Sequence, residues 1–157
     1  MQYINLDAQV GNLSGVISPA RYLERLPSLA DDLPVGARGF ATAPGHYDFY
    51  SKRCVKDLEV QYIRTVRADD QQMEIQFRHN CWKHDEDLVI RYAGVSRFDV
   101  AGIEDNDWAD LGTVILDEVL PDQNGCSHEI AFGNGSLTIV CRDLVATWTE
   151  TDCPDSS

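Results

Sequence analysis

The sequence predicts a mainly β fold whose antiparallel strands form a sandwich, a roll or a half-open barrel. Three observations lead to this class. Apolar and polar residues alternate over short runs after residue 50, short polar connections separate these runs, and no β-α-β alternation occurs. We expect about six or seven strands, preceded by a short N-terminal helical segment.

A chain of 157 residues has the size of one domain. We expect residues 1–50 to form a helical or irregular segment that packs on the sheet. Residues 51–152 should form the antiparallel β core, and residues 153–157 should form a tail.

A helix should begin at Ser18 and Pro19, because serine is a favoured N-cap and proline fits the first helical turn. Apolar residues follow at helical spacing, but Pro27 interrupts them and predicts two short turns or a kinked helix. Residues 34–45 are rich in proline and glycine and predict an irregular loop.

Six strands are expected in the core. The first three are the period-two runs at 58–62, 73–77 and 88–92, joined across 68–71 and 83–86. The next three are 111–120, buried on both faces, then 127–132 and 137–148, with turns at 121–125 and 133–135. The facing of apolar residues changes near Arg142 and Asp143, which predicts a β-bulge or a strand that crosses between sheets.

Acidic residues dominate the last third of the chain. The net charge is −13, and residues 99–157 hold 13 acidic residues against one basic residue, Arg142. A surface of this sign repels phosphate backbones and anionic lipids, so we expect neither nucleic acid nor a membrane as a partner. It attracts a basic protein surface, although acidic surfaces also simply promote solubility.

The five cysteines contain no C-x-x-C pair, and their number is odd. Residues 1–7 lack the basic and apolar regions of a signal peptide. These observations predict buried, reduced thiols and a cytoplasmic protein. No apolar run approaches the roughly 20 residues that a membrane helix needs.

The densest group of potential metal ligands is the run HNCWKHD at residues 79–85. A zinc site there would use His79, Cys81 and His84, with His46 or His128 as a fourth ligand. The spacing is not a recurrent zinc pattern, and Lys83 would stand close to the cation. We therefore predict no metal and no other cofactor, and interpret the run as a packed thiol with turn histidines.

The acidic run at residues 104–110 has the composition of a calcium loop. It lacks the glycine and the bidentate glutamate that an EF-hand loop needs in register. Trp108 stands among its carboxylates. This ring either packs into the core or, if exposed, has the form of an interface anchor for a basic protein.

A general acid–base site is a further alternative. Adjacent strand residues face opposite ways, so neither Asp117-Glu118 nor His128-Glu129 forms a dyad by itself. Asp117 or Glu118 could reach His128 if their strands are neighbours. Because no nucleophile or cofactor motif accompanies these residues, an enzyme is not favoured. Residues 45–50 carry three aromatic rings that either close one end of the sandwich or bind a sugar or peptide.

The chain resembles small bacterial immunity proteins of contact-dependent or polymorphic toxin systems and related uncharacterised families. The resemblance lies in the meander followed by a terminal hairpin and in residues 116–119, 128–132 and 139–144, LDEV, HEIAF and IVCRDL. These families share no common site, so no functional residue is carried over. The resemblance implies a non-enzymatic protein that binds a partner.

The charge and the resemblance together suggest that the acidic stretch 99–122 covers a basic surface, such as the active site of a toxin nuclease. The rival hypothesis is a small-molecule or catalytic site in a pocket lined by His46, His79 or His128. The residues expected to contact a partner are Glu104, Asp105, Asp107, Trp108, Asp110 and Asp117.

Overall fold

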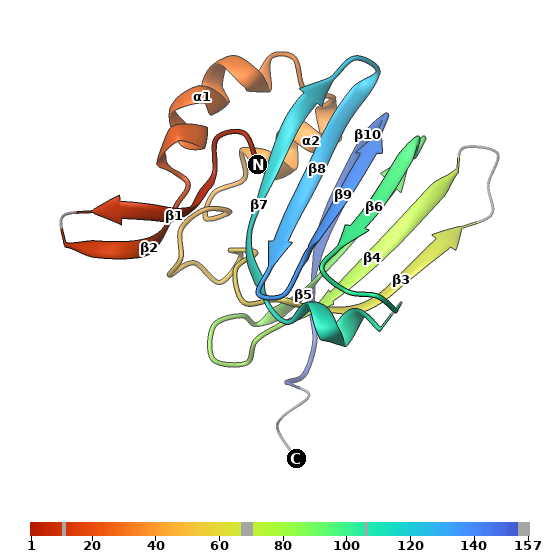
Figure 1. The fold of residues 1–157 in the computed structure, drawn as a ribbon. Helices are drawn as coiled ribbons and strands as arrows, with labels where there is room; N and C mark the ends of the chain where they lie inside the picture. The colour runs from red at the N-terminus through yellow and green to blue at the C-terminus, as the bar shows by residue number, and fades with distance from the viewer. Residues whose placement is uncertain (11, 67–70, 106, 154–157) are drawn as a thin grey trace.

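The computed structural model describes residues 1–10, 12–66, 71–105 and 107–153. Two four-stranded antiparallel sheets form a sandwich, which confirms the predicted mainly β class (Figure 1). The first sheet has the order β10-β5-β4-β3, with β3 at Glu59–Val66, β4 at Gln72–Arg78, β5 at Glu86–Ala93 and β10 at Asp143–Glu150. The second has the order β6-β9-β8-β7, with β6 at Arg97–Ala101, β7 at Val114–Asp122, β8 at Gly125–Phe132 and β9 at Ser136–Cys141.

Alternating apolar side chains build the core between the sheets. Met73, Ile75 and Phe77 of β4 are buried, and Leu137 and Ile139 of β9 belong to the same continuous core. The three predicted runs are confirmed as strands β3, β4 and β5. In β3 a register shift between Val60 and Tyr62 turns Tyr62 to the outer face, where its hydroxyl donates to Glu74 at 2.9 Å. Ile63 rather than Tyr62 therefore pairs with the inward-facing Ile75. Residues 67–70, which hold most of the expected first hairpin turn, lie outside the described residues.

The chain passes from one sheet to the other between β9 and β10. Cys141 ends β9 in the second sheet, and Asp143 begins β10 in the first sheet. The change of facing near Arg142 and Asp143 is therefore a crossing between sheets, one of the two predicted alternatives. Each side of this junction turns its apolar residues toward the same core.

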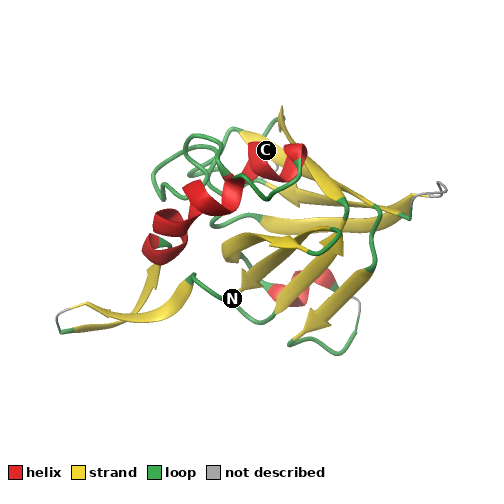
Figure 2. Ribbon diagram, turned by 90° about the horizontal axis from the view of Figure 1, so that it is seen from above, coloured by secondary structure: helices red, strands yellow, loops and turns green. Residues whose placement is uncertain are grey.

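The described residues form ten strands, more than expected from the sequence. One further strand arises because the last predicted strand is two. The others are β6, a short edge strand, and the hairpin of β1 (Asn5–Val10) and β2 (Leu13–Ser18). These three have few buried apolar positions, so period-two patterning does not reveal them. The hairpin projects from the body of the sandwich (Figures 1 and 2).

Two α-helices follow the hairpin. Helix α1 spans Ala20–Ala30 and contains Pro27, so of the two predicted alternatives, two short turns or a kinked helix, the two separate turns were wrong. Ser18 Oγ accepts the backbone N–H of Ala20, at 3.3 Å, and Pro19 is the N-cap residue. Helix α2 spans Val35–Ala41, where an irregular loop was expected.

The helices cover the side of the sandwich where β7 and β10 are edge strands (Figure 2). The Tyr22 hydroxyl of α1 donates to the Val119 carbonyl of β7, at 2.7 Å. The Asp143 carboxylate accepts the backbone N–H groups of Gly36 and Ala37 at the start of α2, at 3.1 and 2.9 Å. Through these contacts both helices pack on the edges of the two sheets. They bury edge-strand positions that would otherwise face solvent.

One end of the sandwich, called the loop end below, gathers four connections. Strand register places Glu59 beside Arg78 and Glu150 beside Glu86 in the first sheet. In the second sheet, Ala101 pairs with Ser136, and an isolated bridge joins Thr113 to Glu59 of the first sheet. The loop end therefore comprises residues 79–85, 102–105, 107–113, 133–135 and 151–153 (Figure 1). The 3-10 helix η1, Trp108–Leu111, belongs to it.

Within the described residues, the α-helices are too short and too polar to cross a membrane.

Candidate functional site

A chain of four buried polar side chains runs through the core. Asp117 of β7 stands between two histidines: Oδ1 lies 2.7 Å from His46 Nε2, and Oδ2 lies 2.7 Å from His128 Nε2. The other ring nitrogen of His128 lies 2.8 Å from the Tyr92 hydroxyl. All four residues are at most 2% exposed. The neighbouring strands β7 and β8 thus bring Asp117 beside His128, as the acid–base alternative required.

The hydrogen-bond partners indicate which ring nitrogens of His46 and His128 carry protons. His46 Nδ1 faces the Phe40 carbonyl at 2.8 Å, and its Nε2 faces the carboxylate. Both partners only accept, so both ring nitrogens of His46 carry a proton. His128 faces Asp117 with Nε2 and the Tyr92 hydroxyl with Nδ1, and a tautomer that carries its proton on Nε2 satisfies both contacts. His46 and Asp117 form a buried ion pair.

The pKa values shift in the directions that an ion pair requires. Burial lowers the pKa of His46, but the Asp117 charge, its hydrogen bond and the Phe40 carbonyl raise this pKa above its ordinary value. Burial raises the pKa of Asp117, but the His46 charge and hydrogen bonds from both histidines lower it well below its ordinary value. Burial also raises the pKa of Tyr92 far above its usual range.

The void inside this hydrogen-bonded row of side chains is too small for a substrate, whereas two larger cavities, of about 420 and 280 Å³, include His46 in their walls. The void beside Asp117 and His128 measures about 10 Å³, roughly the space that a single water molecule needs. Its other walls are apolar core residues such as Phe77 and Ile130. The hydrogen bond from His46 to Asp117 joins the His46 loop to β7.

Glu118, the neighbour of Asp117, points the opposite way, as expected for adjacent strand residues. Its carboxylate accepts three consecutive backbone N–H groups, from Gln2, Tyr3 and Ile4, at 2.7, 2.7 and 2.8 Å. The amino group of Met1 forms an ion pair with Glu129, at 3.1 Å. Asp117 and Glu118 of β7 thus fix two parts of the N-terminal segment to the second sheet.

The residues expected to contact a partner divide into three groups. Glu104, Asp105, Asp107 and Asp110 are exposed at the loop end. Trp108 is half-buried and packs edge-on against Phe98, with ring centroids 6.4 Å apart. Asp117 is 1% exposed, so its inclusion in a partner surface was wrong. From the sequence, an acidic residue in an apolar strand is expected to face solvent. In the structure, two histidines from other segments cover Asp117 and bury it.

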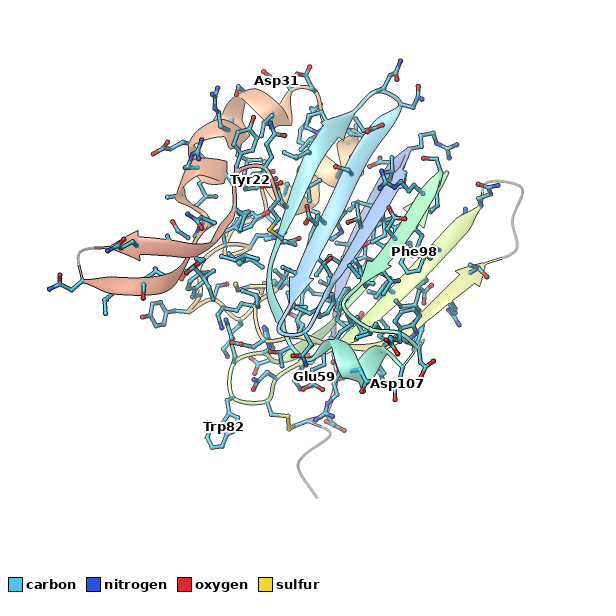
Figure 3. The ribbon with its side chains drawn as sticks, viewed as in Figure 1. Tyr22, Asp31, Glu59, Trp82, Phe98 and Asp107 are labelled. Carbon is cyan, nitrogen blue, oxygen red and sulfur yellow. A yellow bond between two sulfur atoms is a disulfide. The ribbon has the colours of Figure 1, made fainter. Side chains whose placement is uncertain are left out.

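The most exposed aromatic ring of the loop end is one that the sequence did not single out. Trp82, at the tip of the loop between β4 and β5, is 98% exposed (Figure 3). Tyr50, in the loop after α2, is 96% exposed, whereas His46 and Tyr47 of the same aromatic run are buried. The available signal in the sequence is a tryptophan in a polar turn between two predicted strands.

Several contacts hold the Trp82 loop in place. His84 is buried, and its Nε2 donates to the Cys54 carbonyl at 2.8 Å while its Nδ1 accepts the Asn80 N–H at 3.1 Å. Lys83 pairs with Asp57 at 3.4 Å. A disulfide joins Cys81 to Cys153, across 72 positions of sequence. The tryptophan therefore projects from a braced loop.

The disulfide corrects the expectation that all five cysteines are reduced and buried. Cys54, Cys126 and Cys141 are free and buried, as expected, and the Sγ atoms of the latter two lie 3.6 Å apart. Cys81 does not continue the core row of β4, and Cys153 is bonded rather than part of a free tail. The distance between the two in sequence concealed this pairing.

A cleft of about 690 Å³ lies beside the disulfide. Its walls are His79, Cys81, His84, Asp85 and residues 150–153. His46 lines two other cavities, of about 420 and 280 Å³, and His128 lines the small void in the core, so none of these cavities joins two of the three histidines of the rival hypothesis.

No protein-family model matches this chain, and no curated protein matches it at a significant level of sequence similarity. Function is therefore argued from the geometry of the described residues.

Proposed function

We propose that the protein is a non-enzymatic binding domain whose loop end engages a basic protein surface, with Trp82 as the central anchor. The observation that carries this proposal is the 98% exposure of Trp82 on a loop that is fastened on both sides. A fully exposed indole has an unfavourable contact with water that a partner pocket removes, and tryptophan is among the residues most enriched in binding hot spots.

The bracing of the loop favours binding because it lowers the entropy lost on association. Arg53 forms a bidentate pair with Glu86, at 2.8 and 3.0 Å, and joins the loop after α2 to the start of β5. Lys52 pairs with Asp85 across the same two loops, at 2.6 Å. Tyr50, in the first of these loops, offers a second exposed ring for the same partner.

The charge of the loop end favours a basic partner. Glu104, Asp105, Asp107 and Asp110 are exposed on the connection from β6 to β7, and Asp107 also caps η1 through the Ala109 N–H. Glu150 and Asp152 add two exposed acidic residues at the end of β10. Acidic residues on the same end of the sandwich as an aromatic anchor steer a basic surface toward that end and disfavour acidic competitors.

In a more specific form, the proposal is that the protein neutralises a toxin. Its loop end would cover the basic substrate-binding surface of a nuclease domain, and steric occlusion with electrostatic steering would be the whole mechanism. This form rests on the resemblance to immunity proteins together with the acidic, aromatic character of the loop end.

The test uses the binding partner purified after chemical cross-linking to the intact chain in its native cells. Trp82→Ala should weaken the purified complex at least ~30-fold, the effect of removing a hot spot of about 2 kcal/mol. Val35→Ala is the matched control, since Val35 is an 80% exposed apolar residue on α2, next to Asp143 at the opposite end of β10. Equal weakening by both variants, or none by Trp82→Ala, would refute the anchor.

Charge is tested separately by reversing Asp105 and Asp110 to lysine. Association should slow, and its dependence on salt concentration should flatten, whereas dissociation should change less. A cognate partner that associates equally fast with the variant would contradict the steering mechanism, and an acidic partner would contradict the proposal as a whole.

A further inference from the structure

The disulfide lies beside a histidine whose geometry matches that of a metal ligand. His79 is 4% exposed, and its Nε2 lies 3.9 Å from Cys81 Sγ. The ligand atoms of His79, Cys81 and Cys153 all lie within 4.8 Å of one another. Tetrahedral zinc, with bonds of about 2.3 Å to sulfur and about 2.0 Å to nitrogen, separates such a pair of ligand atoms by about 3.6 Å.

Asp87 orients the imidazole toward the sulfur atoms. Its Oδ1 accepts both the backbone N–H of His79, at 2.9 Å, and the ring Nδ1–H, at 2.7 Å. This pair of bonds leaves the lone pair of Nε2 facing Cys81. A carboxylate behind a histidine is the usual outer partner at zinc sites, because it fixes the tautomer and raises the basicity of the ligand.

We propose that the reduced chain binds one Zn²⁺ through His79 Nε2, Cys81 Sγ and Cys153 Sγ, so that the disulfide and the metal are alternative states of one site. Reduction by a dithiol or a phosphine adds two electrons and two protons to the disulfide and forms two thiols. Zinc then displaces both thiol protons and binds two thiolates. The fourth position faces the cleft of about 690 Å³ and accepts water or a cleft carboxylate.

The fold allows the sulfur atoms to move apart to the about 3.8 Å that two zinc thiolates require. Cys153 follows the end of β10 at Glu150 and belongs to no strand, so its movement breaks no sheet pairing. This ligand set differs from the set that the sequence suggested, which was His79, Cys81 and His84. Both ring nitrogens of His84 are already hydrogen-bonded, to Cys54 and Asn80, so Cys153 takes its place.

The experiment uses the full chain in two states that share one sequence. The protein is reduced with a water-soluble phosphine, desalted without oxygen and titrated with Zn²⁺ against a chromophoric chelator. The oxidised protein is the matched control. We expect one tight site in the reduced protein and none in the oxidised protein. Co²⁺ in place of Zn²⁺ should show the absorption of a tetrahedral thiolate site, and zinc should protect Cys81 and Cys153 from alkylation.

Variants separate this site from the three buried thiols. Asp87→Asn should lower zinc affinity about 10–100-fold by loosening His79, and Cys153→Ser should lower it further. Circular dichroism verifies that each variant is folded. Zinc binding that is equal in the oxidised and reduced proteins would overturn the proposal. Alkylation protection at Cys126 rather than Cys153, or binding unchanged in Cys153→Ser, would overturn it as well.

Discussion

Replacing Asp117 with asparagine should reverse the way in which pH changes the contribution of His46 to the free energy of unfolding. In the native protein, His46 carries both ring protons because its partners are the Asp117 carboxylate and the Phe40 carbonyl. An asparagine amide can donate to His46 Nε2 and still accept from His128. Deprotonated His46 would keep its Nδ1–H bond to Phe40. The variant therefore favours neutral His46.

The sign of the pH dependence follows from the protons bound. The raised pKa of native His46 contributes stability that is fully present below the unfolded value of about 6.5 and is lost as pH rises through the folded value. The lowered pKa of Asp117 contributes stability above about 3.9 that is lost as pH falls. In the variant, burial without the carboxylate lowers the pKa of His46, so that its contribution reverses.

The size of the effect follows from a difference of one bound proton between the folded native protein and the folded variant. Above about pH 5 the two unfolded chains bind the same number of protons, while the folded native protein binds one more than the folded variant. The destabilisation caused by Asp117→Asn should therefore shrink by about 1.4 kcal/mol for each pH unit of increase. Between pH 5.5 and 8 it should fall at this slope from roughly 4 kcal/mol, typical of a broken buried ion pair, until the pH passes the raised pKa of native His46 and the slope levels off.

The assay is urea unfolding of both proteins at several pH values, with the free energy of unfolding extrapolated to zero denaturant. Asp32→Asn is the control, since Asp32 is an exposed carboxyl and its substitution should have a small effect at every pH. A destabilisation by Asp117→Asn that stays constant across this pH range would refute the assignment of a charged His46.

Three further expectations test the packing. Tyr92→Phe leaves Nδ1 of His128 without its donor and should cost about 1–3 kcal/mol of unfolding free energy; no loss would show that another donor takes over. Gly36→Ala would place a Cβ 1.9 Å from the Leu144 carbonyl oxygen and should lower the thermal midpoint by separating α2 from β10, with loss of α2 protection in hydrogen exchange. Thiol titration of the unreduced protein in denaturant should find three thiols, rising to five after reduction; five at the outset would contradict the disulfide.

The loop-end proposal and the zinc proposal concern neighbouring groups but are independent. Trp82 follows Cys81 directly, so either the disulfide or the metal would fasten the base of the loop that carries the ring. Binding of a partner through Trp82 requires no metal, and binding of zinc requires no partner.

The sequence alone determined the features that depend on local periodicity. The alternation in residues 73–77 and 88–92 predicted β4 and β5, and the change of facing near Arg142 predicted that the last strand could cross between sheets. A strand buries every second residue, so its buried face can be recognised from a short stretch of sequence. The same periodicity could not reveal the β1–β2 hairpin, whose residues are largely exposed.

Only the tertiary structure decided what the polar residues do. Asp117 looks like a surface acid in the sequence, but His46, from 71 positions away, and His128 bury it in an ion pair. Cys153 looks like part of a tail, but it meets Cys81 and His79 at the loop end. These contacts depend on the order of the strands and on how the N-terminal segment packs. A buried polar group must find a partner, and that partner can come from any part of the chain.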